Sequence, residues 1–433
     1  MKLGVISLGC PKNTVDTECM LSMLSGFTLT TDPADADVII INTCAFLKSA
    51  REESRSAISD MLGFRKKNPR LKIVVAGCYV SKDLEELQKK YPQIHGWVGV
   101  NDIENTGRAV KEGGIFASSK PFIYKGASHT VMLNPYSAYV KISEGCNHRC
   151  SFCAIPGIKG RYRSRKTGDI AAEIKRLVEG GVKEINLISQ DLVYYGADLY
   201  GKKMLPLLLK RILASTDKYF WLRLLYLYPD EEVITKTAGV MASDGRVCAY
   251  ADIPFQHISD SVLKSMKRGY GRASVERVIQ TLRKKVKGIV IRSSFIAGYP
   301  GETEADLSEL KEFISSGAVD RAGVFEYSDE PGTAAYLMKG KNPAPVIKRR
   351  TKALMLASAL ICEYNNNKLL GTVTEAVITG KTGKNKYSGR AKQNAPDIDG
   401  YLRLSSAHNL KPGDFVKARI TGMSGPELKG EVL

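Results

Sequence analysis

The sequence predicts an α/β protein of three parts: a small parallel-sheet domain, a central parallel β/α barrel, full or partial, and a small antiparallel β-barrel. Three patterns in the 433 residues support this fold class. Apolar strand-like runs alternate with helix-like segments through residues 1–115, and they do so again, for longer, through residues 136–345. Such alternation is typical of parallel sheets with crossover helices. From residue 371 on, short runs of alternating polarity are separated by Gly and Pro, as in small antiparallel barrels.

The first part carries a cysteine just after each of three strand-like runs. The runs are at residues 3–8, 38–41 and 73–76, and the cysteines are Cys10, Cys44 and Cys78. Helix-like segments follow at 13–24, 46–64 and 81–91. Because the carboxyl ends of parallel strands meet at one edge, where ligands bind in open α/β sheets, we expect the three thiols at a common edge. Each cysteine alone is better explained as a buried side chain, but the three together indicate a site.

The central part has six candidate strands with helices between them. The strands are expected at 137–142, 184–189, 221–227, 250–254, 288–297 and 321–327. In such barrels the active site lies at the carboxyl ends of the strands. Residues 116–135, rich in Ser, Lys and Gly, are predicted to be a linker. The expected domains are therefore 1–115, 136–345, a connecting helix at 346–367 and a barrel at 368–433.

A second group of cysteines lies just past the first of these strand ends. Cys146, Cys150 and Cys153 have the spacing C-x3-C-x2-C in a polar loop between Gly145 and Pro156. A cubane iron–sulfur cluster normally takes four thiolates, so three cysteines leave one iron open to a substrate or cofactor. The clustered spacing and the odd total of nine cysteines suit metal binding in a reducing compartment better than disulfides.

Further polar residues and glycines are expected around the same pocket. Gln190 and Gln256 each follow a barrel strand, and Gly298 and Gly301 lie in a strand–turn–helix segment where glycine permits close backbone approach to a ligand. A plain turn explains the glycines equally well. Arg163 lies in the middle of three alternating arginines after the cysteine loop, and its planar fork suits a carboxylate. A solvated basic loop is the alternative for this segment.

The charge indicates an acidic partner. The formal net charge is +19, and most of the excess lies in residues 131–369. Such a balance favours a nucleic acid or a ribonucleoprotein as partner, although a general effect on solubility is the alternative. No stretch approaches the roughly 18 apolar residues that a membrane span requires, and the first residues do not form a signal sequence. We therefore expect a cytoplasmic protein with no membrane partner.

Taken together, the two cysteine triads and the three parts resemble the methylthiotransferases of the radical S-adenosylmethionine (SAM) superfamily. In that family one 4Fe-4S cluster is bound by three cysteines that match Cys10, Cys44 and Cys78, and a second by three that match Cys146, Cys150 and Cys153. The last part resembles the small barrel called TRAM. The resemblance also implies that SAM binds at the open iron of the central cluster, with the segment of Gly298 and Gly301 near its adenosine. Gln190, Gln256 and Arg163 are candidates for contact with SAM or the substrate.

Two short motifs resemble the branch of the family that modifies an aspartate of a small-subunit ribosomal protein. They are Pro11-Lys12 after the first cysteine and the segment 395–400, Ala-Pro-Asp-Ile-Asp-Gly. The resemblance implies methylthio insertion at the β-carbon of that aspartate, with flavodoxin or ferredoxin as electron donor. Pro331 and the basic charge are also typical of the branch that modifies tRNA adenosine, which is the first alternative. A non-catalytic iron–sulfur protein that binds RNA or the ribosome is the second.

Overall fold

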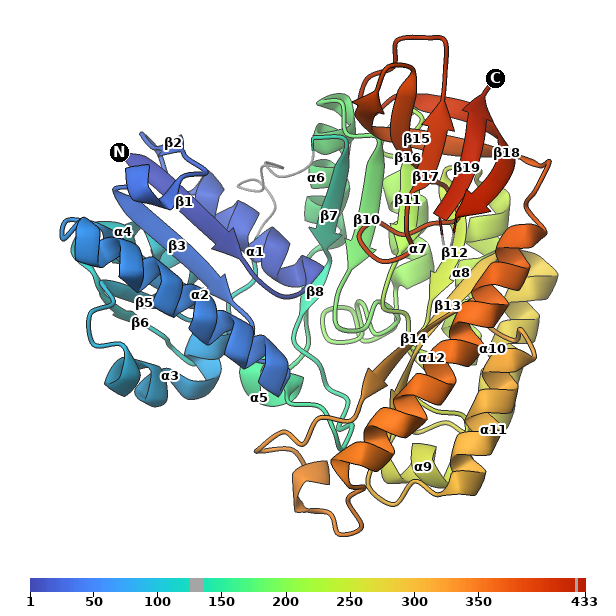
Figure 1. Ribbon diagram of the computed structural model, residues 1–433, viewed down its shortest axis with the longest axis horizontal. Helices are drawn as coiled ribbons and strands as arrows, with labels where there is room; N and C mark the ends of the chain where they lie inside the picture. The colour runs from blue at the N-terminus through green and yellow to red at the C-terminus, as the bar shows by residue number, and fades with distance from the viewer. Residues whose placement is uncertain (125–134, 425–426) are drawn as a thin grey trace.

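The computed structural model describes residues 1–124, 135–424 and 427–433. It contains two six-stranded parallel sheets and a closed five-stranded barrel, so the predicted fold class is confirmed. In Figure 1 the N-terminal sheet lies on one side of the central sheet, and the C-terminal barrel lies over one end of it. Residues 125–134 of the predicted linker lie outside the described residues.

The N-terminal sheet has the strand order β2-β1-β3-β4-β5-β6, and all its pairs are parallel. Its strands are β1 (Lys2–Ser7), β2 (Thr28–Leu29), β3 (Val38–Thr43), β4 (Lys72–Gly77), β5 (Gly96–Val98) and β6 (Gly114–Phe116). Its helices are α1 (Pro11–Ser22), α2 (Lys48–Lys67), α3 (Cys78–Lys90) and α4 (Thr106–Glu112). Every residue of β3 is buried, as expected for a central parallel strand with both faces covered.

The central sheet has the order β14-β13-β12-β11-β10-β7 and is also parallel throughout. Its strands are β7 (Ser137–Lys141), β10 (Glu184–Ile188), β11 (Trp221–Leu224), β12 (Val247–Asp252), β13 (Val290–Ala297) and β14 (Arg321–Glu326). Because β14 and β7 are the two edges and do not pair, the barrel is partial. A short ribbon of β8 (Ser143–Glu144) and β9 (Arg163–Ser164) closes the loop that contains the second cysteine triad.

Helices cover one face of the central sheet. They are α6 (Thr167–Glu179), α7 (Leu205–Leu213), α8 (Glu231–Ser243), α10 (Arg272–Lys285), α11 (Glu304–Ser315) and α12 (Ala344–Asn367). Two short helices lie elsewhere: α5 (Ile155–Lys159) packs on α3, and α9 (Asp260–Ser265) lies in the loop after β12. Strand β13 shows the resulting division, because Ile291 and Phe295 are buried in the core on the helical side, whereas Arg292 and Ser294 alternate with them toward the inner face. The inner face of the sheet therefore carries charged and polar side chains.

The C-terminal barrel has the closed order β15-β16-β17-β19-β18. Its strands are β15 (Val373–Gly383), β16 (Lys386–Ala391), β17 (Leu402–Ser405), β18 (Phe415–Ser424) and β19 (Glu427–Val432). Four of the five pairs are antiparallel, as predicted, but β17 and β19 pair in parallel to close the barrel. The sequence pattern does not indicate strand β16, because its residues lack a clear alternation of apolar and polar side chains.

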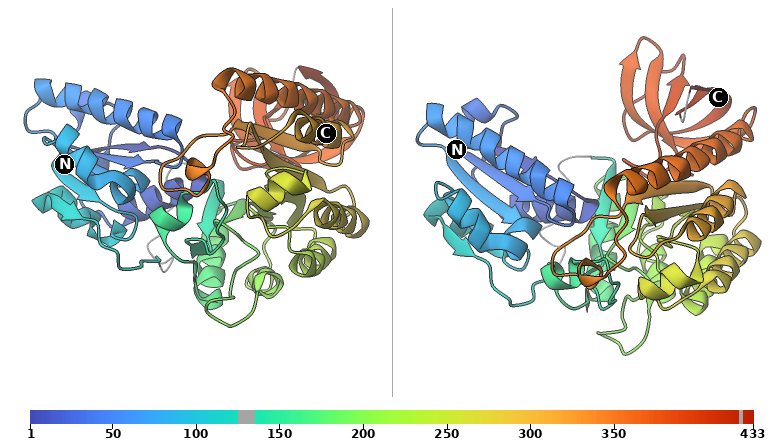
Figure 2. Two further views of the ribbon diagram at one scale, coloured as in Figure 1. Left: turned by 90° about the horizontal axis from the view of Figure 1, so that it is seen from below. Right: turned by 60° about the horizontal axis from the view of Figure 1, so that its bottom comes forward.

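Buried charges hold this barrel against the inner face of the central sheet. Glu184, the first residue of β10, accepts hydrogen bonds from Arg223 on β11 and from Arg390 on β16. Asp399 accepts a hydrogen bond of 2.5 Å from the hydroxyl of Tyr250 on β12. Both views in Figure 2 show the C-terminal barrel against the central domain and away from the N-terminal sheet. Buried ion pairs of this kind fix orientation, because a charge left without its partner is costly.

Among the described residues, no helix is both long and apolar enough to cross a membrane.

Glu184 provides a test of this docking. Burial alone would raise the pKa of Glu184, but Arg390 and Arg223 outweigh it and lower the pKa to about 2. A carboxylate whose pKa is lowered on folding contributes stability that is present above its ordinary value and is lost as the pH falls through the folded value. We expect Glu184→Gln to reduce stability at pH 7 by about 3–5 kcal/mol, since two buried arginines lose their partner.

Thermal unfolding measured between pH 2 and pH 7 checks this expectation. The difference between wild type and variant shrinks as the pH falls from about 4.5 toward 2, because wild-type Glu184 is then protonated as well. Equal unfolding temperatures at pH 7 would contradict the role given to Glu184.

Candidate functional site

The first cysteine triad lies at the carboxyl edge of the N-terminal sheet, as predicted. Cys10 is the N-cap of α1 after β1, Cys44 follows β3 directly, and Cys78 is the first residue of α3 after β4. Gly9 has φ +88°, and a Cβ placed there would lie 2.7 Å from the Cβ of Cys44. The turn that carries Cys10 and the turn that carries Cys44 are therefore in contact.

One amide side chain joins all three cysteine turns. Asn13 Nδ2 donates to the carbonyl oxygens of Leu8 and Thr43, at 3.0 Å each. Its Oδ1 accepts from Cys78 Sγ at 3.7 Å. Sequence reasoning did not single out Asn13, although a polar residue one turn into α1, three residues after Cys10, is the local signal. The amide holds the three turns in one arrangement before any ligand binds.

The second triad lies in the loop closed by β8 and β9. Gly145 has φ +79°, and a Cβ there would lie 2.2 Å from the carbonyl oxygen of Arg161, so the loop needs glycine at this point. Cys146 N donates to Gly160 O at 3.1 Å, and Cys153 N donates to Cys150 O at 3.1 Å. These backbone bonds give the loop a fixed shape.

Arg268 is a residue of this site that the sequence did not reveal. Its Nη1 donates to Cys150 Sγ at 3.1 Å, and its Nη2 donates to the carbonyl oxygen of Pro254 at 2.9 Å. The rings of Tyr228 and Tyr270 lie about the guanidinium, with centroids at 4.8 and 5.2 Å. A fixed, buried cation therefore lies beside the sulfur of Cys150.

The donor sets fit iron–sulfur clusters. All six cysteines are free thiols. Burial raises the pKa of Cys78 and of Cys153 to about 12 and that of Cys146 to about 11, so these thiols are protonated at neutral pH and would release protons on binding metal. No three acidic, His or Cys side chains in the described part of the chain are placed to bind one ion. A cubane has a different requirement, because each thiolate binds a separate iron.

A buried group of four charges connects the two triads. Asp16 on α1 pairs with Lys141 at the end of β7 and, at 3.0 Å, with Lys159 on α5. Glu144 lies 2.5 Å from Lys141 and 3.6 Å from Lys159. Burial alone would raise the pKa of Glu144, but the two lysines outweigh it and hold that pKa well below its usual range. All four side chains are almost fully buried.

This group, which we call the charge tetrad, brings the triads to the same region. Asp16 lies on the helix that Cys10 caps, and Glu144 precedes the Gly145-Cys146 turn. Helix α5 follows Cys153 and packs on α3, the helix that begins at Cys78. Figure 1 shows α1 and α5 on the N-terminal side of the central sheet, between the two domains.

The five other predicted site residues have different surroundings. Gln190 Nε2 donates to Glu144 Oε1 at 2.7 Å, so this side chain extends the charge tetrad, and its buried Oε1 has no hydrogen-bond partner among the described residues. Gln256 lies four residues after the end of β12, has φ +74° and is half-buried. Arg163 donates to the carbonyl oxygens of Lys159, Arg161 and Phe122 and to Asn101, so its fork already joins the cysteine loop to the N-terminal domain.

Gly298 and Gly301 have unlike surroundings although both have φ +80°. A Cβ on Gly298 would lie 2.5 Å from Cγ1 of Ile347 on α12, whereas a Cβ on Gly301 would meet nothing within 4 Å. Helix packing thus accounts for Gly298, where we expected close approach of a ligand. The turn after β13 also contains Glu302, whose carboxylate accepts from Gly298 N at 2.9 Å.

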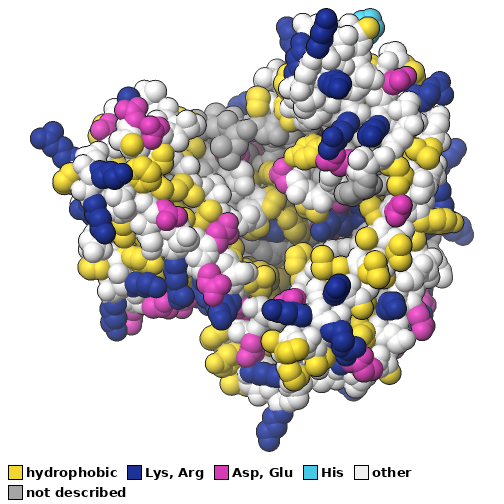
Figure 3. Space-filling view, in the orientation of Figure 1, with side chains coloured by type: hydrophobic (Ala, Val, Ile, Leu, Met, Phe, Trp, Pro, Cys, Tyr) yellow, Lys and Arg dark blue, Asp and Glu magenta, His cyan; other side chains and the backbone are white. Residues whose placement is uncertain are grey.

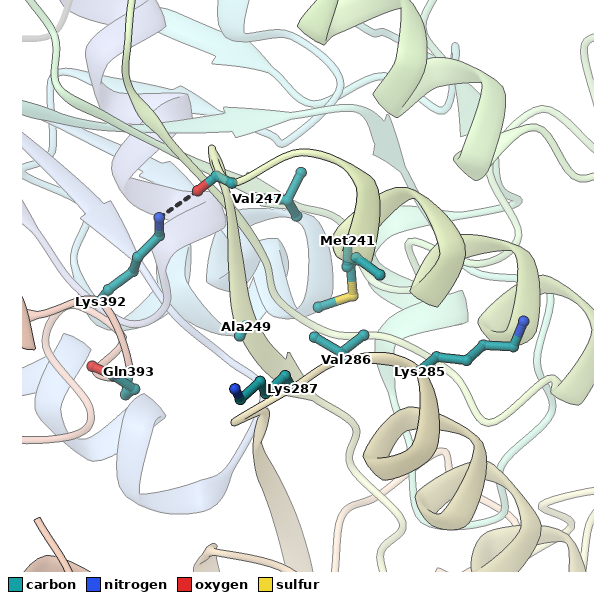
Figure 4. A pocket seen from close by; sticks show the side chains of 10 residues that line it. Met241, Val247, Ala249, Lys285, Val286, Lys287, Lys392 and Gln393 are labelled. Carbon is teal, nitrogen blue, oxygen red and sulfur yellow. Dashed lines mark hydrogen bonds between the residues drawn. The ribbon is translucent and has the colours of Figure 1, made fainter.

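Two cavities of 320 Å³ each lie away from both triads. The one in Figure 4 is lined by Met241, Val247 and Val286, with Lys392 bonded to the carbonyl oxygen of Gly245 at its edge. The surface is also hollowed between the N-terminal domain and the C-terminal barrel, as Figure 3 shows.

Three family models match the chain. They are Uncharacterized protein family UPF0004 over residues 2–99, the Radical SAM superfamily over residues 140–314 and the TRAM domain over residues 370–433. The first covers the cysteine triad and all strands of the N-terminal sheet except β6, the second covers the second triad and most of the central sheet, and the third covers the C-terminal barrel.

Relatives match over the full length. A protein of Pelotomaculum thermopropionicum named ribosomal protein uS12 methylthiotransferase RimO is 42% identical over 100% of this chain and 99% of its own length. Proteins with the same name from Clostridium botulinum and Desulforamulus reducens are 39% and 40% identical. The first match spans 100% of this chain and 98% of the relative, and the second spans 99% of each.

Solved structures with the same fold are more distant. The radical S-adenosylmethionine methyltransferase TsrM of Kitasatospora setae has a TM-score of 0.53 at 15% identity and covers 75% of this chain and 72% of its own. The cobalamin-dependent S-adenosylmethionine radical enzyme OxsB has a TM-score of 0.53 at 14% identity, covering 80% and 56%. At such identities the likeness concerns the fold alone.

The two glycines after β13 form a matched pair for testing how this turn is held. Alanine at either position must adopt a left-handed conformation, which costs about 1–2 kcal/mol. Gly298→Ala must also displace Ile347, which adds about 1–3 kcal/mol of overpacking. We expect Gly298→Ala to lower the unfolding temperature clearly more than Gly301→Ala. Equal decreases in a thermal melt would show that α12 does not restrict this turn.

Proposed function

Because the chain belongs to the RimO family of ribosomal protein uS12 methylthiotransferases, we propose that it inserts a methylthio group at the β-carbon of an aspartate in that protein. It is a radical SAM transferase. The observation that carries the proposal is the pair of cysteine triads, one at the edge of each parallel sheet, joined through the charge tetrad.

We propose that each triad holds one 4Fe-4S cluster and that SAM binds at the central one. When bound, these groups supply the radical chemistry that breaks an unactivated C–H bond and the methylated sulfur that replaces the hydrogen. The protein holds them through the six thiolates. Asn13 sets the spacing of the first triad through its bonds to Leu8 O, Thr43 O and Cys78. The positively charged guanidinium of Arg268 donates a hydrogen bond to the sulfur of Cys150.

The remaining parts of the proposal concern cofactor contacts and partners. Gln256 and Gly301 remain candidates for contact with SAM, because Gln256 is half-buried in the loop after β12 and nothing lies within 4 Å of a Cβ at Gly301. Within the protein, the side chains of Gln190 and Arg163 already form hydrogen bonds, and Gly298 packs against Ile347. These three residues would contact SAM through their remaining atoms. A flavodoxin or ferredoxin as electron donor and a cytoplasmic location stay predictions.

The relatives favour the protein substrate over tRNA adenosine and over a non-catalytic role. The segment 395–400, whose sequence suggested this branch, lies against the inner face of the central sheet. Asp399 accepts from Tyr250, and the exposed Asp397 accepts from Tyr139 at 2.9 Å. This segment therefore borders the face on which a substrate would lie.

Substrate choice tests the proposal. The protein is reconstituted without air and given SAM, reductant and sulfide, and a peptide with the target aspartate and bulk tRNA are offered in parallel. We expect a methylthio mass gain on the aspartate and none on tRNA, read by mass spectrometry. A gain on a tRNA adenosine alone would contradict the proposal.

Cysteine variants in the same assay distinguish the roles of the two triads. Replacing Cys146, Cys150 and Cys153 with alanine should abolish SAM cleavage, whereas replacing Cys10, Cys44 and Cys78 should leave cleavage but abolish methylthio insertion. Full methylthio insertion without the first triad would exclude the role proposed for it.

A further inference from the structure

Lys12 is a buried cation near Cys10, Asp252 and Glu144 that forms no ion pair with any of them. It lies in the first turn of α1, and it is 9% exposed. Its ammonium forms no ion pair and no hydrogen bond in the described part of the chain, and it lies 3.1 Å from the centroid of the Tyr226 ring. A buried ammonium without a partner is costly, so the site favours binding of an anion.

Arg292 belongs to the central domain, as Tyr226 does, and is linked to this tyrosine through Asp252. Its Nη1 donates to Asp252 Oδ1 at 2.9 Å, and the backbone N of Tyr226 donates to Asp252 Oδ2 at 3.1 Å. One buried carboxylate therefore fixes both the arginine and the tyrosine. Tyr226 has φ +66°, a conformation that non-glycine residues rarely adopt and that is often found at functional sites.

The outer end of Arg292 is open. Its Nη2 has no acceptor within the described residues. Gly323 on the adjacent strand keeps this end accessible, since a Cβ there would lie 3.1 Å from Nη2. Phe325, two residues further along β14, is 48% exposed, so the sheet is open to solvent on this side.

The charges around these two residues do not cancel. Arg292 faces Asp252 and, at 3.7 Å from Nε, Asp399, and Arg321 lies 4.0 Å from Asp399. With Lys12 these side chains comprise three cations and two carboxylates, an excess of one positive charge before the neighbouring Cys10 and Glu144, which also act on Lys12, are counted. A single carboxylate from a ligand would balance it, and the fork of arginine suits such a group.

We propose that Lys12 and Arg292 together bind the side-chain carboxylate of the substrate's target aspartate. This inference rests on the proposed function and identifies the chemical group of the substrate that the site recognises. The carboxylate is one bond from the β-carbon, so two cations that hold it also fix the carbon that reacts. An adenine carries no such anion, and the same pair therefore selects a protein substrate against a nucleobase.

The test compares two peptides that span the target loop, one with the aspartate and one with asparagine in its place. Their dissociation constants are measured by calorimetry on the cluster-loaded protein. We expect wild type to prefer the aspartate peptide by about 30-fold or more, as for a buried charge pair. Arg292→Gln and Lys12→Met should each reduce that preference to a few-fold, and Arg292→Lys should retain an intermediate preference.

Arg321→Gln is the matched control. Arg321 lies opposite Arg292 in the register of the two strands and has a similar side-chain exposure. Its guanidinium, however, donates to Asp399 and Asn394 of the C-terminal barrel. Arg321→Gln should weaken the preference less than Arg292→Gln does, because Arg321 contributes to the positive charge but its guanidinium is bonded to the C-terminal barrel. The electron paramagnetic resonance spectra of the clusters should be unchanged in Arg292→Gln and in Lys12→Met.

Two outcomes would overturn the inference. The first is an undiminished preference for aspartate in both variants, and the second is an altered cluster spectrum in Lys12→Met with the preference intact, which would assign Lys12 to the cluster instead. Failure of the proposed function is recognised separately, because wild-type protein would then add no methylthio group to the aspartate peptide.

Discussion

The charge tetrad of Asp16, Lys141, Glu144 and Lys159 is the contact on which the arrangement of the two triads depends. Removing four charges from water is expensive, and the cost is offset only when each charge meets its partners in good geometry. Asp16 belongs to the N-terminal domain and the other three to the central domain. Few relative positions of the two domains satisfy all four groups, so the helix that Cys10 caps and the loop of Cys146 are held together.

Buried charges also pair with one another along the inner face of the central sheet. Its outer face is a continuous apolar core, whereas the inner face carries Glu184, Arg223, Asp252 and Arg292. The amino-terminal end of this face is closed by the C-terminal barrel through Arg390. The region toward the cysteine loops stays polar, with one cation in excess, and that is where an acidic side chain of a substrate fits best.

Much of the fold could be predicted because it follows from local patterns. All six strands of the central sheet and the three cysteine turns of the N-terminal sheet occur where apolar runs and turn residues indicate them. Asn13 and Arg268 could not be found in this way, since their partners lie far along the chain. For the same reason Arg163 and Gly298, which resemble ligand contacts in sequence, are explained in part by packing with Asn101 and Ile347.

If each triad holds a cluster as proposed, the charge tetrad sets the distance between the two clusters. The most direct measurement is the magnetic interaction between the reduced clusters, recorded by electron paramagnetic resonance for wild type and for Asp16→Asn at full iron content. The account predicts coupled spectra in wild type and a clear change of the coupling in the variant, because Lys141 and Lys159 lose one of their two carboxylates. Identical spectra would contradict it, since the spacing would then be set elsewhere.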